Sequence, residues 1–163
     1  MNIDRCEAGF DHESVKLIGI FAEEAMPDSV SLAPLSGEML EICRRALING
    51  NYKAKAGSTI RIPVLHGSVR YVVVHGIGSK KEELQENIRE GSFAISRTAA
   101  SKKCSSVYIR MPFVPDRLSS RSAAEGAVLG CYCFDKYLSQ EEDEKLMPAE
   151  AVYVSEADPS GLN

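Results

Sequence analysis

The apolar positions of the chain follow two spacings that alternate along it. Short apolar runs rich in β-branched residues predict buried strands, and apolar residues three or four apart predict one face of a helix. Strand-type runs lie at 15–21, 58–65, 68–75, 104–111 and 151–155, with a short edge strand expected at 1–6. Helical spacing lies at 38–48, from 79 to about 101, and at 119–138. Strands that alternate with helices predict an α/β fold, here a three-layer sandwich around a mixed, mostly parallel sheet of five or six strands.

The one antiparallel element in this pattern is a hairpin in the middle of the chain. Ser58–Leu65 and Ser68–His75 are separated by His66-Gly67, which is the spacing of a tight hairpin turn. The second strand, VRYVVVH, is almost entirely apolar and β-branched. Such a run suits a strand that is covered on both faces, so we expect it within the sheet.

The helix expected at 119–138 carries a face made only of small side chains. Ser122, Gly126 and Gly130 recur every four residues, beside an apolar stripe on the same helix. A glycine inside a helix costs about 1 kcal/mol relative to alanine, so two of them need a structural reason. We expect the bare face to let this helix pack closely against the sheet or another helix.

Composition places the chain among ordinary globular proteins. The apolar fraction is 44% and the formal net charge is −4, so the chain lacks the basic surface of nucleic-acid-binding proteins. No apolar run approaches the roughly 18 residues that cross a membrane, and the N-terminus lacks a signal-peptide pattern. We therefore expect a cytoplasmic protein with neither a nucleic-acid nor a membrane partner. The five cysteines are an odd number without a secreted framework, and we expect them to be reduced, small buried groups.

A glycine turn between a strand and a helix is the first candidate for a binding site. Gly76-Ile77-Gly78 precedes Ser79, which forms a capping-box pattern with Glu82 at the expected helix start. Backbone N–H groups at such a turn can hold a phosphate, with Lys80 and Lys81 as auxiliary charge. The dinucleotide-binding fingerprint would need a glycine where Lys81 stands, so a plain strand-to-helix turn is the alternative.

The side chains that usually carry catalysis or bind metals are scattered in this sequence. His12, His66 and His75 lie far apart, and none has an acidic residue or a cysteine at ligand spacing. The G-x-S-x-G pattern of a nucleophilic serine is absent. The residues alone therefore predict no catalytic residue, no metal and no cofactor for this chain.

One segment near the end of the last helix matches a known family. It reproduces the pattern EG-x-x-LG-x-Y-x-FD-x-Y through Glu125-Gly126, Leu129-Gly130, Tyr132, Phe134-Asp135 and Tyr137. This pattern resembles the end of the N-terminal domain in the leucyl (cytosol) aminopeptidase family, which continues with a lysine where this chain has Leu138. The passage VHGIGSKKEEL is similar to the family's strand–GLG–K-x-E–helix passage. The segment 52–58 is similar to its F-x-G-K-x-G-E segment, with Ala54 in place of a glycine and Ser58 in place of an acid.

The resemblance implies a macro-domain-like fold for residues 1–155 as a non-catalytic N-terminal domain, and the start of a linker at 156–163. Members of the family are metallopeptidases that release N-terminal amino acids from peptides with two divalent metal ions, zinc or manganese, held in a C-terminal catalytic domain. Their metal-ligand segments, of the types N-T-D-A-E-G-R and K-G-x-x-F-D-S-G-G, do not occur in this sequence. The resemblance thus implies that the chain alone is inactive and that its partner is the catalytic domain of the same polypeptide. It also implies that the parent is a homo-oligomer, a hexamer.

Two functions from different classes follow from these observations. The first is a structural domain that serves domain packing and oligomer assembly, with Tyr132, Phe134 and Tyr137 as candidate contacts to another domain or subunit. The alternative for Phe134 and Tyr137 is that both rings fill the core of this domain. The second function is a stand-alone macro-like module that binds ADP-ribose or another phosphate ligand through Gly76-Ile77-Gly78-Ser79.

Overall fold

The computed structural model describes residues 1–6, 11–79, 81–111, 116–132 and 146–155. Its strands are β1 (Asn2–Cys6), β2 (Leu17–Glu23), β3 (Thr59–His66), β4 (Val69–Gly78), β5 (Ser106–Arg110) and β6 (Ala151–Ser155). Its helices are α1 (Gly37–Asn49), α2 (Leu84–Ser101) and α3 (Arg117–Cys131), with short 3₁₀ turns η1 at His12–Ser14 and η2 at Lys81–Glu83. Every strand and helix expected from the sequence is present, although several of their ends differ.

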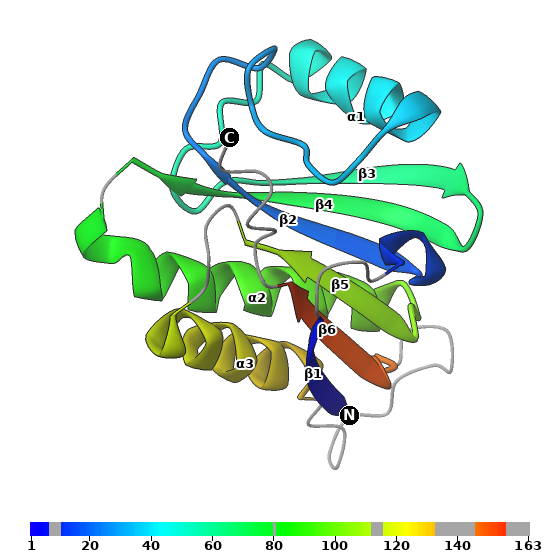
Figure 1. The fold of residues 1–163 in the computed structure, drawn as a ribbon, viewed down its shortest axis with the longest axis vertical. Coiled ribbons are helices and arrows are strands. Elements are labelled where there is room, and N and C mark those ends of the chain that lie inside the picture. Colours follow the sequence, from blue (N-terminus) through cyan, green and yellow to red (C-terminus); the bar gives the residue numbers. More distant parts are fainter. Residues whose placement is uncertain (7–10, 80, 112–115, 133–145, 156–163) are drawn as a thin grey trace.

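The six strands form one mixed sheet in the order β1-β6-β5-β2-β4-β3 (Figure 1). Neighbouring strands are parallel except for β3 and β4, which form the expected antiparallel hairpin. From β2 the chain passes through α1 to this hairpin, and from β4 it crosses through α2 to β5 on the other side of β2. The predicted mixed, mostly parallel sheet is confirmed.

The hairpin differs from the prediction at its turn and at the end of β4, which extends to Gly78. His66 pairs with Val69, so the turn consists of Gly67 and Ser68 and lies one residue later than expected. Gly67 has a φ of 57°, the left-handed conformation that glycine adopts readily. Strand β4 is covered on both faces as predicted, with Val72 and Val73 fully buried.

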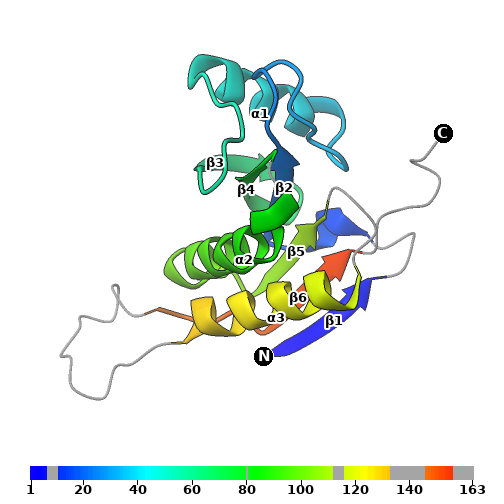
Figure 2. The same cartoon turned by 90° about the vertical axis from the view of Figure 1, so that its left-hand side faces the viewer.

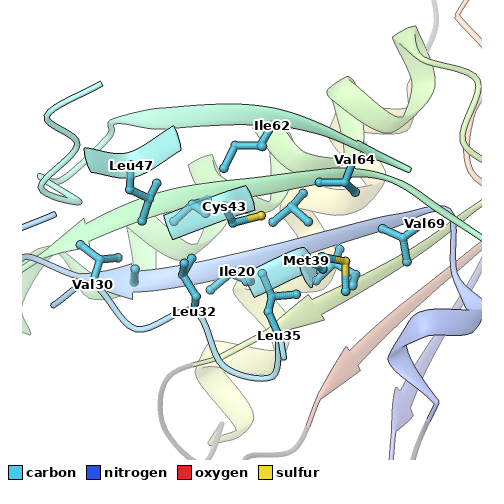
Figure 3. Close-up of a cluster of buried hydrophobic side chains, with 14 of the residues drawn as sticks. Ile20, Val30, Leu32, Leu35, Met39, Cys43, Leu47, Ile62, Val64 and Val69 are labelled. Atoms are coloured by element: carbon cyan, nitrogen blue, oxygen red, sulfur yellow. The ribbon is translucent and has the colours of Figure 1, made fainter. Parts of the chain in front are cut away.

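Helix α1 covers one face of the sheet over β2, β4 and β3 (Figures 1 and 2). Its buried residues, Met39, Cys43 and Leu47, are four apart and form one stripe. They belong to a core cluster that includes Ile20 of β2 and Ile62 of β3 (Figure 3). This helix is one outer layer of the sandwich.

Helices α2 and α3 cover the opposite face, which confirms the three layers (Figure 2). Leu17 and Phe21 of β2 belong to the core on this side, whereas Ile18 and Ile20 belong to the core beneath α1. This alternation is the ordinary period of a strand. Because helices cover both faces, β2 is buried at every position except Glu23, which explains its continuous apolar run.

Helix α3 packs on α2 through its small residues. A Cβ atom on Gly126 would collide with the carbonyl oxygen of Arg89, and one on Gly130 would lie 2.6 Å from the carbonyl oxygen of Phe93. The third small residue, Ser122, donates a hydrogen bond of 3.0 Å from its hydroxyl to a side chain of α2. The close contact expected from the spacing of these residues is therefore confirmed, and the partner is a helix.

Helix α2 begins later than its capping pattern predicts. The expected start at Ser79, with a capping bond to Glu82, is wrong, because the regular helix begins at Leu84 and no side chain caps it. The residues of η2 are charged and exposed, whereas Leu84 packs against the core. Burial of an apolar side chain, and not the polar cap, thus determines where this helix begins.

Helix α3 ends earlier than expected. Its last residue is Cys131, and Tyr132 has the extended dihedral angles φ −66° and ψ 127°. The prediction of a helix as far as 138 is therefore wrong at Tyr132, and 133–138 lie outside the described residues. Cys131 is buried and Tyr132 is exposed, so the packing that supports the helix stops where the helix stops.

Candidate functional site

The carboxyl ends of β2, β4 and β5 meet at the centre of the sheet, where the connections of the chain diverge. The chain leaves β2 toward α1 on one face and leaves β4 toward α2 on the other (Figure 1). A crevice forms where neighbouring connections leave toward opposite faces, and open α/β sheets bind their ligands at such points. The topology therefore favours a ligand-binding crevice at this edge of the sheet.

A β-bulge at this edge positions two carboxylates. The register between β2 and β4 shifts at their ends, so that Glu23 pairs with Gly78 and Ile77 has no residue opposite it. Bulges redirect side chains and are frequent next to functional sites. Glu23 and Glu24 are both exposed, and both line the two cavities at this edge.

The first cavity lies on the α2 side of the end of β2 and has a volume of about 480 Å³. Gly78, Ser79 and Lys81 line it together with Glu23 and Glu24, so it contains part of the predicted phosphate site. Among the described residues, two carboxylates in this cavity face one ammonium group. Like charges repel, so this lining disfavours a phosphate ligand.

The predicted glycine turn is the end of strand β4, and its glycines have a packing role. A Cβ atom on Gly76 would collide with the backbone at Ala54, and Gly78 adopts a left-handed φ of 69°. The N–H of Gly76 donates to the carbonyl oxygen of Ser58 at 2.8 Å, and that of Gly78 donates to the carbonyl oxygen of Ala54 at 3.3 Å. Both donors are thus used within the fold, and the phosphate site stays a prediction.

The segment that packs on these glycines contains Ala54, which stands where the family pattern has a glycine. Ala54 has a φ of 55°, a region that residues other than glycine rarely adopt. The segment is held in place by Tyr52, whose hydroxyl lies within hydrogen-bond distance of the carbonyl oxygens of Ser58 (3.0 Å) and Val74 (3.2 Å). The left-handed conformation gives a physical reason for the glycine found in the family pattern at this position.

The second cavity lies on the α1 side of the end of β2 and has a volume of about 400 Å³. Arg110, the last residue of β5, lines this cavity together with the same two glutamates. Arg110 is paired in the sheet with Ile20 of β2, and the segment between β2 and α1 adds the hydroxyls of Ser29 and Ser31. A guanidinium, carboxylates and hydroxyls together can donate and accept hydrogen bonds to a charged small molecule.

Three of these lining residues, Arg110, Glu23 and Glu24, were not predicted from the sequence. Each stands at or directly after the end of an apolar strand run. This position could have indicated a binding role, because the carboxyl ends of parallel strands carry ligand-binding residues. The missing information was the strand order, which brings β5 and β2 together.

His75 is a buried residue of β4, with 3% of its surface exposed. Thr59 Oγ1 and His75 Nδ1 share a hydrogen bond of 2.7 Å, and Nε2 has no hydrogen-bond partner among the described residues. Burial, together with the positive charge of Arg61, lowers the pKa of His75 to about 4. The ring is therefore neutral at neutral pH, and it lines neither of the two cavities.

The other potential metal ligands of the described residues do not converge. No three His, Cys, Asp or Glu side chains within the described ranges lie close enough to hold a metal ion together. Cys43, Cys104 and Cys131 are free and buried, as expected for small core residues. Burial raises the pKa of the Cys43 thiol to about 11, so this thiol is protonated and unreactive.

Helix α3 and the residue after it carry four exposed large apolar side chains, which are Leu118, Val128, Leu129 and Tyr132. Tyr132, the first of the three candidate contact residues, is 62% exposed. Phe134 and Tyr137 lie outside the described residues. Tyr132 is therefore not part of the core of this domain.

Glu125, which opens the family segment, joins α3 to α2. Its carboxylate accepts hydrogen bonds from Arg121 Nε at 2.8 Å and from Arg89 Nε at 3.1 Å. These two guanidinium groups hold the pKa of Glu125 below its usual value. Because Arg89 belongs to α2, the pairing adds a polar contact to the helix packing at Gly126.

Comparison with known proteins identifies relatives for most of the chain. The N-terminal domain of the cytosol aminopeptidase family matches residues 17–141. A probable cytosol aminopeptidase of Aquifex aeolicus is 31% identical over 149 residues, which cover 90% of this chain and 30% of that protein. A probable cytosol aminopeptidase of Rhizobium johnstonii is 33% identical over 159 residues, which cover 91% of this chain and 31% of that protein. Among solved structures, a tomato leucine aminopeptidase mutant has a TM-score of 0.75, at 15% identity, covering 97% of this chain and 33% of that chain.

The matched region runs from the start of β2 to beyond the end of α3, so it includes both cavities and the packed helix pair. The chain spans about 30% of the length of the curated relatives it matches. Within the described ranges, none of the helices is long and apolar enough to cross a membrane. The tomato structure shares the fold, and the family match rests on sequence. The chain therefore belongs to the cytosol aminopeptidase family, and it corresponds to the N-terminal domain of that family.

Proposed function

We propose that this chain serves as the non-catalytic N-terminal domain of a leucyl aminopeptidase, an enzyme that releases N-terminal amino acids from peptides in the cytoplasm. The observation that carries the proposal is the match of residues 17–141 to the N-terminal domain of the family. The chain also spans only about 30% of its relatives, so the remainder of a full-length aminopeptidase would hold the catalytic domain in the same polypeptide.

Two divalent metal ions, zinc or manganese, would supply the chemistry of the parent enzyme. Paired metals generate a hydroxide nucleophile and polarise the peptide carbonyl. The described residues do not fit this role, because no three of their His, Cys, Asp or Glu side chains converge. We therefore assign both metals to the catalytic domain and derive no catalytic step from the residues of this chain.

The role of the domain would be to pack against the catalytic domain and to help assemble the oligomer, a hexamer. The exposed apolar residues of α3, which end at Tyr132, support this role. Exposed apolar patches on folded domains often mark surfaces that bind other proteins. We propose Tyr132, with Phe134 and Tyr137 of the same family segment, as the contacts to the catalytic domain or a neighbouring subunit.

Hydrolysis of a leucyl chromogenic substrate tests the proposal. We expect the purified chain to release no chromophore with added zinc or manganese, because it lacks the family's metal-ligand segments. A full-length cytosol aminopeptidase assayed in parallel is the positive control. Metal-dependent turnover that stays with this chain through successive purification steps would contradict the proposal.

A further inference from the structure

The cavity on the α1 side of β2 contains an arginine whose hydrogen-bond donors are available. Arg110 is partly buried at the end of β5, and its guanidinium forms no hydrogen bond or ion pair with the described residues. A guanidinium presents a planar fork of donors that matches a carboxylate or a phosphate. An arginine that lines a cavity in this way is suited to bind one anionic group of a ligand.

Two carboxylates line the same cavity. Glu23 and Glu24 lie at the bulged end of β2, and neither forms an ion pair with a described residue. They outnumber the single guanidinium, so a phosphate with two negative charges would be repelled. The same carboxylates attract an ammonium group. A ligand with one carboxylate and one ammonium group therefore matches the charges of this cavity.

The remaining lining of the cavity is apolar or carries hydroxyl groups. Ala25 and Ala33 contribute accessible apolar surface above the buried Ile20 and Phe21, and Ser29 and Ser31 contribute hydroxyls. The volume of about 400 Å³ lies within the range of roughly 300–1,000 Å³ that is typical of small-molecule pockets. An apolar side chain on the ligand would contact the apolar part of this wall.

We propose that this cavity binds the zwitterion of an apolar α-amino acid. The carboxylate of the amino acid pairs with Arg110, and its ammonium group pairs with Glu23 and Glu24. The site lies at the crevice where the connections after β2 and β4 diverge, which is the position at which this fold class binds ligands. Binding involves no bond making, so this proposal goes beyond the packing role and stands independently of it.

Titration of the isotopically labelled chain with L-leucine, followed by NMR of its amide groups, tests the proposal. We expect saturable shifts at the end of β2, in the segment 24–33 and at Arg110. Two analogues separate the charges, because 4-methylpentanoate lacks the ammonium group and L-leucinamide lacks the carboxylate. Each analogue should bind at least about tenfold more weakly than L-leucine, since a charge-assisted hydrogen bond is lost. Inorganic phosphate should give no saturable shift.

Two arginine variants complete the test. Arg110→Gln should weaken L-leucine binding at least about tenfold, and it should not weaken the binding of the cation L-leucinamide, which has no carboxylate to pair with Arg110. Arg97→Gln is the matched control, because Arg97 is also partly buried but lies over the ring of Phe93 on α2 and does not line the cavity.

The proposal is overturned if L-leucine gives no saturable shift, if phosphate binds more tightly than L-leucine, or if both variants weaken L-leucine equally. The analogue series uses the unmodified chain, so it decides the question even if Arg110→Gln does not fold. None of these measurements involves peptide hydrolysis, so the result is independent of the proposed peptidase parent.

Discussion

A single buried histidine couples the stability of this domain to pH. In the folded chain the pKa of His75 is lowered to about 4, against 6.5 for an unperturbed histidine. The unfolded state therefore takes up a proton more readily than the folded state. The contribution of the neutral ring to stability is fully present above pH 6.5 and is lost as the pH falls toward the folded pKa of about 4.

Comparison of the wild type with His75→Asn measures this coupling. Asparagine keeps a polar atom near Thr59 but does not titrate. Between pH 7 and pH 4, we expect the free energy of unfolding to fall by about 3 kcal/mol more in the wild type than in the variant. Denaturant unfolding at both pH values provides the measurement. An identical pH dependence of the two proteins would show that His75 is not the group responsible.

At the scale of elements, the apolar spacing predicted every described strand and helix because that spacing reflects which faces are buried. The stripe on α1 and the hairpin of β3 and β4 are examples. The prediction was wrong where a local polar signal competed with packing. The capping pattern of Ser79 and Glu82 placed the start of α2 too early, because the first apolar contact is made by Leu84.

The candidate site was much less predictable than the elements. Gly76 and Gly78 were predicted as part of a binding site, but these glycines are needed for the close approach of the segment at Ala54. Arg110 and Glu23 are 87 residues apart in the sequence. They share a cavity only because β5 lies beside β2 and a bulge ends the pairing of β2 with β4. Neither the strand order nor the bulge can be predicted from the spacing of apolar residues.

The contact between α2 and α3 gives a prediction at the same scale. Gly130→Leu should destabilise the chain by about 1–3 kcal/mol or more, because the added side chain meets the backbone of α2 at Phe93. Val128→Leu is the control, since Val128 is exposed on the same helix and its replacement should change stability by less than about 0.5 kcal/mol. Denaturant midpoints measure both effects. Equal midpoints for the wild type and Gly130→Leu would count against the close contact.

At the scale of the whole molecule, the two faces of the sheet are covered in different ways. One face is covered by a single helix, α1, which buries Ile20 and Ile62 against it. The other face carries α2 and α3, whose mutual packing is closer than an ordinary helix contact because glycines form it. The apolar residues that α3 leaves exposed are thus carried by a closely packed pair of helices.

The last prediction concerns this surface of α3 and its end at Tyr132. In the isolated chain, Tyr132→Ser should change the free energy of unfolding by less than about 0.5 kcal/mol, because the side chain is 62% exposed. In a full-length aminopeptidase that contains this chain, the same change should shift sedimentation toward smaller species. Leu65→Ser is the control, since Leu65 is 95% exposed on the edge strand β3 and should alter neither measurement. If Tyr132→Ser leaves assembly unchanged, or unfolds the isolated chain as a core substitution would, Tyr132 is not a contact to another domain or subunit.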